Sequence, residues 1–154
     1  MDVTLTPIGR ILSPFKTKEE CPIQFHASSA IGRVVVADEF AAGLMDITDF
    51  SHLYLLYLFD RASEVVMQRK TFLDDTAHGV FATRHPARPN PLGLSIVRLL
   101  SVEGTTLEVE GIDVLDNTPL IDIKPYIPRF DHVATASNGW VASKPWRPKP
   151  AGRE

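Results

Sequence analysis

Apolar residues in this chain occur in short runs that proline, glycine and polar residues interrupt. These runs are typical of β-strands and predict seven of them, at residues 8–12, 31–36, 53–59, 79–83, 94–102, 105–112 and 120–123. Helical spacing is scarce and favours only two short helices, at 40–45 and 62–69. We therefore expect a mainly β fold whose sheet closes on itself or doubles back.

Two of these runs also predict which strand faces are covered. Leu107 and Val109 alternate with glutamates after a turn at Gly104, which predicts a hairpin with one wet face. The run HLYLLYLF, residues 52–59, does not alternate. It predicts a strand covered on both faces or, as the alternative, a buried helical segment.

Composition narrows the class of protein. The 154 residues, 44% of them hydrophobic, fit one globular domain. The net charge is −3, so the protein as a whole is not basic in the way expected of a nucleic-acid binder. Cys21 is the only cysteine, so an intramolecular disulfide and a cysteine-based zinc site are excluded. The apolar run 53–59 is too short to span a membrane and the amino terminus lacks signal-peptide features, so we expect a soluble, cytoplasmic protein.

Familiar catalytic motifs are absent from the sequence. It contains no GxGxxG, GxxxxGK[ST], HExxH or GxSxG, and no succession of strands and long helices of the Rossmann type. Dinucleotide, P-loop, zincin and hydrolase-elbow hypotheses therefore lose their usual support, and we expect no metal.

The stretch ATRHPARPNPLGLS, residues 82–95, is unusually rigid and polar. Its prolines should hold His85, Arg88 and Asn90 extended, while Gly93 permits a turn into the next strand. Such a loop would present two guanidinium groups to a carboxylate or phosphate. The alternative is a stiff crossover whose arginines form structural ion pairs.

A second dense stretch, LDNTPLIDIKPYIPRFD, covers residues 115–131. Its first part, 116–119, predicts a turn, and Asp122 and Lys124 should then lie on the same side of a strand. They form either an exposed ion pair or part of a site shared with the first loop. His52 precedes the run 53–59, where a hydrogen-bonded core histidine is commoner than a ligand, whereas Asp60 and Arg61 follow it at a rim.

The last residues form a basic, proline-rich tail. We divide the chain into a barrel domain at 1–140 and a tail at 141–154, which an extended or docked strap would fit better than a helix. Cations interleaved with tryptophans suit a single-stranded nucleic acid, or a solvated terminus pinned to the core. The residues concerned are Trp140, Lys144, Trp146, Arg147, Lys149 and Arg153.

Two of these motifs resemble those of a known family. TRHPARPNPLGLS is similar to T-R-x-P-x-R-P-N-P-I-G-L-S, and DNTPLIDIKPYIP is similar to D-G-T-P-v-v-D-I-K-P-Y-x-P. Together with IGRILSPF and FSHLYLLYLF, they identify the chain, from about residue 8 to 131, as a member of the TrmO family, also called TsaA-like or YaeB-like.

The resemblance implies a fold and a reaction. The fold would be a single small closed β-barrel with short helices, a non-Rossmann methyltransferase that binds S-adenosylmethionine and forms a homodimer. The reaction would be methylation of N6 of threonylcarbamoyladenosine at position 37 of tRNA, with the tRNA held by loop arginines and the basic tail. A methyltransferase of the same fold with a small-molecule acceptor, and a non-catalytic S-adenosylmethionine-binding module, stay open as alternatives.

The resemblance also implies a set of site residues. Carried over by position, the cofactor pocket falls on Pro22, Gln24, Asp60, Arg61, Arg84, Asn90, Leu94, Asp116, Thr118 and Pro119. The proton of the acceptor nitrogen could leave with help from Asp122, Tyr126 or His85, and Lys124 would stabilise charge on the carbamoyl group.

The chain departs from the family pattern at three points. Ile23 stands where many relatives have arginine, and Asn117 replaces a glycine, which requires a positive φ there. Longer relatives carry a carboxy-terminal domain suited to gripping tRNA, and this sequence ends without one.

Overall fold

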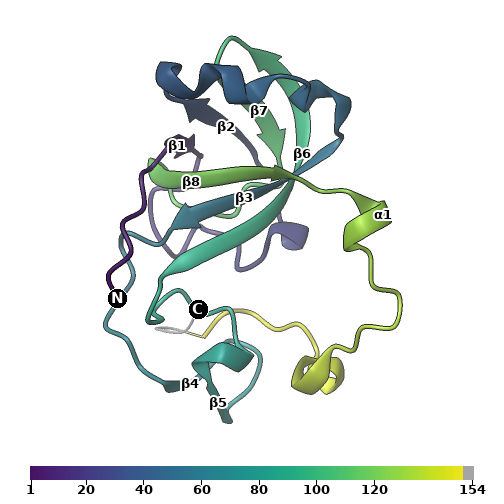
Figure 1. The fold of residues 1–154 in the computed structure, drawn as a ribbon. Helices are drawn as coiled ribbons and strands as arrows, with labels where there is room; N and C mark the ends of the chain where they lie inside the picture. The colour runs from purple at the N-terminus through teal and green to yellow at the C-terminus, as the bar shows by residue number, and fades with distance from the viewer. Residues whose placement is uncertain (151–154) are drawn as a thin grey trace.

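Six strands close into a β-barrel in the computed structural model, which describes residues 1–150 (Figure 1). They are β1 (Gly9–Leu12), β2 (Ile31–Val36), β3 (His52–Leu58), β6 (Leu92–Glu103), β7 (Thr106–Glu110) and β8 (Thr118–Pro125). Their order around the barrel is β1-β2-β7-β6-β3-β8, and every neighbouring pair is antiparallel. The expectation of a mainly β, closed barrel without a Rossmann sheet is confirmed.

Short elements surround the barrel. A separate two-stranded hairpin joins β4 (Gln68–Lys70) to β5 (Ala77–Gly79), and one α-helical turn, α1 (Pro128–Asp131), follows β8. The 3₁₀ turns are η1 (Phe25–Ala27), η2 (Asp38–Leu44), η3 (Ile47–Asp49), η4 (Val80–Ala82) and η5 (Gly139–Ser143). After α1 the chain, yellow in Figure 1, runs back below the barrel toward β4 and β5.

Alternate residues of the barrel strands fill its interior. Aliphatic side chains from every strand are fully buried there, among them Ile11, Val34, Leu53, Val97, Val109 and Leu120. Burial of this kind stabilises by about 25 cal/mol per Å² of apolar surface. The barrel is therefore a packed core, and ligands must bind at its ends or on its outer wall.

The β6–β7 hairpin matches its prediction. Gly104 has φ +61°, in the left-handed region that a tight hairpin turn needs, and Leu107 and Val109 point into the core between exposed or half-exposed neighbours. In β3 the inward side chains are buried and the outward ones half-buried. The run 52–59 thus forms a strand covered in part on its outer face, and the helical alternative is wrong.

Two predicted elements are wrong and a third differs in type. Residues 79–83 form no barrel strand, because Thr83 bonds back to Val80 O through its N–H (3.2 Å) and its hydroxyl (3.0 Å), which closes a 3₁₀ turn. Residues 62–69 form no helix, since Val65, Val66 and Met67 stay exposed and offer no face to the core. The helix expected at 40–45 overlaps η2, which ends at Leu44 and is a 3₁₀ helix.

Candidate functional site

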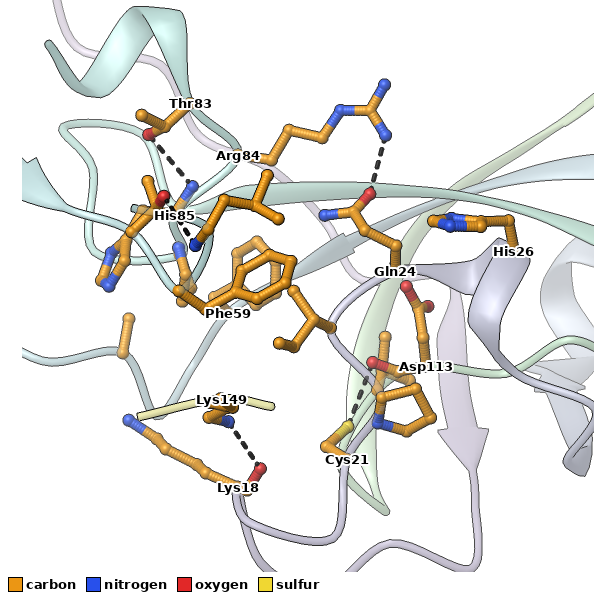
Figure 2. Close-up of a pocket in the computed structure, with 18 of the residues that line it drawn as sticks. Lys18, Cys21, Gln24, His26, Phe59, Thr83, Arg84, His85, Asp113 and Lys149 are labelled. Carbon is orange, nitrogen blue, oxygen red and sulfur yellow. Dashed lines mark hydrogen bonds between the residues drawn. The ribbon is translucent and has the colours of Figure 1, made fainter. Parts of the chain in front are cut away.

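A pocket of about 750 Å³ lies at one end of the barrel. Segments far apart in sequence contribute to its lining: residues 18–26, the chain after β3 from Phe59 to Ala62, the loop 81–86, residues 113–115 with Thr118, and the tail between Ser137 and Lys149. Figure 2 shows Arg84 and Gln24 joined on one side of this pocket and Lys18 and Lys149 joined on the other, with Phe59 between them. The volume lies within the range of about 300–1,000 Å³ typical of small-molecule sites.

The proline-rich loop 82–91 is held by bonds within itself. His85 accepts a hydrogen bond at Nδ1 from the Ala87 N–H (3.0 Å), and the His85 N–H donates to the Thr83 hydroxyl (3.3 Å). Arg88 donates to the carbonyl of Thr83 (2.9 Å). The expectation that both arginines are displayed to a ligand is therefore wrong for Arg88, because Arg88 fixes the loop. Of the two arginines, only Arg84 faces the pocket, where it donates to Gln24 Oε1 (2.8 Å).

Gly93 has a different role from the turn predicted for it. It lies inside β6, paired with Tyr57 of β3, and its φ is not positive. A Cβ at this position would lie 2.1 Å from the Tyr57 ring, so glycine is required by close approach.

Tyr57 starts a buried hydrogen-bond chain that ends at the pocket. Its hydroxyl lies 2.8 Å from Ser95 Oγ, and Ser95 donates to Asp113 Oδ1 (2.5 Å). Because the serine has one proton and gives it to the carboxylate, the tyrosine must donate to the serine. Asp113 lines the pocket, and its backbone carbonyl accepts a hydrogen bond from Cys21 Sγ (3.1 Å; Figure 2).

Burial dominates the electrostatics of this chain. It raises the pKa of Asp113 to about 7, against the opposing effects of the Ser95 hydrogen bond and the Arg84 charge. Burial also raises the pKa of Tyr57, and the nearby Asp113 carboxylate adds to this shift. Strongly shifted acids in pockets are common at functional sites.

The turn before β8 forms another wall. Arg61 Nη2 donates to the carbonyl of Asp116 (2.9 Å) and to the Thr118 hydroxyl (3.1 Å). The Lys16 ammonium, followed by the Ser13 N–H, lowers the pKa of Asp116. Asn117 has φ +62°, so it adopts the backbone that the family glycine would supply.

The tail completes the pocket. Trp140 donates to the carbonyl of Ala82 (2.8 Å) and stacks on His78 at 3.8 Å, and Trp146 packs edge-on against His26 and Phe72. The tail cations are bonded to the protein: Lys144 to Asp74, Arg147 to Asp75 and Lys149 to the carbonyl of Lys18. Arg153 lies outside the described residues.

Most predicted cofactor residues gather at this pocket. Those lining it are Pro22, Gln24, Asp60, Arg61, Arg84 and Thr118. Asp116 and Pro119 do not line it but lie within two residues of Thr118 in the chain. Asn90 is exposed in the loop, and Leu94, on the outer wall of β6, is 54% exposed, so neither lines the pocket.

The predicted catalytic residues lie elsewhere. Asp122 and Lys124 form an exposed ion pair (3.4 Å), and the Tyr126 ring packs edge-on against Tyr54. Lys124 is the sixth residue after Thr118 along β8, a separation of about 20 Å at about 3.3 Å per residue. Asp122 lines a second cavity, of about 530 Å³, with η2 and η3. A site shared by these residues and the proline-rich loop is therefore not formed within one chain.

Sequence reasoning missed the Tyr57–Ser95–Asp113 chain. Tyr57 was hidden in an apolar run, and Asp113 carries no motif of its own because only the closed barrel brings it to Ser95. His52 is half-buried, and its Nδ1 lies 2.8 Å from Ser51 Oγ, a local bond with no link to the pocket.

A cluster of metal-ligating side chains and a membrane-spanning helix are both absent from residues 1–150. Within them no group of three or more His, Cys, Asp or Glu side chains could hold a metal ion. No helix in this range has the length and apolar character needed to cross a membrane.

Comparisons with known proteins agree on one family. Residues 10–132 match the profile of the tRNA-methyltransferase O N-terminal domain, TrmO_N. A probable S-adenosyl-L-methionine-binding protein of Pyrococcus abyssi is 48% identical over 88% of this chain and 74% of its own length. The tRNA (adenine(37)-N6)-methyltransferase of Mus musculus is 35% identical over 81% of this chain but only 31% of its own length.

A solved structure gives the same result. A crystal structure of TrmO superposes with a TM-score of 0.79 at 41% identity, covering 90% of this chain and 64% of the TrmO chain. The chain thus spans less than two thirds of that protein.

Proposed function

Because the chain belongs to the tRNA-methyltransferase O N-terminal domain family, we propose that it is an S-adenosylmethionine-dependent methyltransferase that methylates N6 of threonylcarbamoyladenosine at position 37 of tRNA. One observation carries the proposal. Six of the ten residues assigned to the cofactor by the family pattern come from four separate segments and line one pocket. A tRNA substrate also supports the expected cytoplasmic location.

The pocket suits the chemistry of the cofactor. The Arg84 guanidinium, bonded to the Gln24 amide, and the Lys18 ammonium can pair with a carboxylate, while Phe59 and Tyr57 supply an apolar wall. S-adenosylmethionine supplies a methyl group on a positively charged sulfur. Loops fixed by proline and by internal hydrogen bonds hold the lining side chains in place and shelter the reacting groups from water.

The acceptor side of the site requires a second copy of the chain. Asp122 and Lys124 lie about 13 Å and about 20 Å along β8 from Thr118 at the pocket, and Tyr126 follows the end of that strand. We infer that these groups are too far from a ligand in the pocket of their own chain to act on it. Leu92 and Leu94 of β6 form an exposed outer apolar surface beside Leu56 and Leu58 of β3, with which they pair in register. We propose a homodimer in which this surface is covered and the partner brings its own β8 residues to the pocket. His85, which accepts the Ala87 N–H, fixes the loop and is the less suitable base.

The reaction is tested with the methyl-labelled cofactor and bulk tRNA from a strain that lacks this modification. Label that mass spectrometry places on N6 of threonylcarbamoyladenosine supports the proposal. Binding of the cofactor without label in tRNA contradicts it and leaves the small-molecule methyltransferase or the non-catalytic binding module, which a metabolite screen separates.

The dimer is tested by mixing two inactive variants, Arg84→Ala and Lys124→Ala, after denaturation and refolding together. Half of the dimers should then combine both chains, and each would carry one intact composite site. The mixture should recover about a quarter of the wild-type activity. No recovery, with both variants dimeric by light scattering, would contradict a site built from two chains.

A further inference from the structure

Asp113 provides a half-buried acidic group in the lining of the pocket. Ser95 bonds its Oδ1 atom, while Oδ2 accepts no hydrogen bond from any other residue in the described part of the chain. Asp113 lines the pocket, and Figure 2 shows its carboxylate beside Gln24. One oxygen is thus positioned by the protein, and the other is available to a ligand.

The charges around the pocket are unevenly placed. Of its basic lining residues, Arg61 and Arg84 are exposed, while Lys18, Lys144 and Lys149 are half-buried. Of the two acidic lining residues, Asp60 is exposed and pairs with Arg61 (3.1 Å), whereas Asp113 is less exposed and bonds to the fully buried Ser95. A ligand that fits this pattern has an anionic end at the rim and a cation inside.

From this geometry we infer that Asp113 is the counter-ion of the positively charged sulfur of S-adenosylmethionine. The sulfonium is a permanent cation surrounded by carbon, and it cannot lose its charge on entering an apolar space. The sulfonium therefore needs an opposite charge inside the pocket. The ammonium group of S-adenosylmethionine needs one less, because it can stay at the rim beside the carboxylate of the same ligand. The inference rests on the proposed function, since it takes S-adenosylmethionine as the ligand.

The hydrogen-bond chain behind Asp113 fits this role. Tyr57 and Ser95, which are 3% and 1% exposed, fix the orientation of the carboxylate without adding a charge. The pKa of about 7 means that the carboxyl group is partly protonated near neutrality in the free protein. A bound cation would shift it to the ionised form, so binding of the cation should strengthen as the pH rises.

Other titratable groups also face this space. The histidines are His85 from the proline-rich loop and His26 from η1. The others are Lys18, Cys21, Tyr57, Asp60, Arg61, Arg84, Lys144 and Lys149. A test must therefore separate the titration of Asp113 from that of the histidines. A variant that changes Asp113 and keeps both His26 and His85 does this.

The experiment compares the affinities for S-adenosylmethionine and for S-adenosylhomocysteine, which has the same groups but a neutral sulfur, by calorimetry. In Asp113→Asn the affinity for S-adenosylmethionine should fall at least about tenfold, while that for S-adenosylhomocysteine changes by less than about threefold. Glu108→Gln, which removes one negative charge from the outer face of β7, is the matched control and should leave the ratio unchanged.

The pH dependence gives a second readout. In the wild type the ratio of the two affinities should rise about tenfold from pH 6 to pH 8, and in Asp113→Asn it should stay flat. Equal losses for both ligands, or a ratio that keeps its pH dependence in the variant, would overturn the inference. If the wild type binds neither ligand, it is the proposed function that fails.

Discussion

Asp113→Asn should stabilise the folded protein at pH 8 even though it weakens ligand binding. The pKa of Asp113 rises on folding from the ordinary 3.8 to about 7, because burial penalises its charged form. Between these values the folded state holds a proton that the unfolded state has lost, so stability falls as the pH rises. The change of about 3 pH units, at about 1.4 kcal/mol per unit, gives about 4 kcal/mol.

Asparagine removes this penalty and keeps an oxygen that can accept the Ser95 hydrogen bond. The gain at pH 8 is therefore at most about 4 kcal/mol, and it should shrink toward zero near pH 4, where the wild-type carboxyl group is neutral in the folded state. Urea unfolding of both proteins at pH 4, 6 and 8 measures the difference directly.

A variant that is no more stable than the wild type at pH 8, with the same dependence on pH, would refute this reasoning. It would show that the ionisation of Asp113 is not coupled to folding. A stabilising replacement that impairs binding is what a group kept for function should give.

Three further predictions follow from the site. Arg84→Ala should weaken S-adenosylmethionine binding about tenfold or more in calorimetry, whereas Arg88→Ala should mainly lower the melting temperature; the reverse pattern would contradict the roles assigned to the two arginines. Gly93→Ala should push the Tyr57 ring from its place and destabilise the fold by about 1–3 kcal/mol in urea unfolding, and an unchanged midpoint would show that the ring can move freely. Trp146→Ala should leave the barrel folded by circular dichroism but lower cofactor affinity, because the tail wall loses its anchor; unchanged affinity would show that this wall does not shape the pocket.

The strands of the barrel could be predicted because each carries its own signal. Leu107 and Val109 alternate with polar residues, and this alternation alone decides which side faces the core. The segment 62–69 carries no such signal in its own sequence. Its apolar residues stay exposed and the chain pairs only at β4, where the partner strand decides the structure.

The candidate site was predictable only where a motif marks it. Arg84 and the turn at Thr118 belong to family motifs, and both line the pocket. Asp113 was not predictable, because its pKa and its partner Ser95 come from the closure of the barrel. The distance of Lys124 from the pocket could not be foreseen either, since the motif shows that residues are neighbours in the chain but not which end of the barrel they reach.

A crystal structure of the protein with S-adenosylmethionine would test the central claim most directly. The account predicts that the ligand occupies the pocket below the barrel, with its carboxylate at Arg84 and its sulfur facing Asp113. Density for the ligand at the second cavity beside Asp122, or an unfilled pocket at saturating ligand, would contradict it.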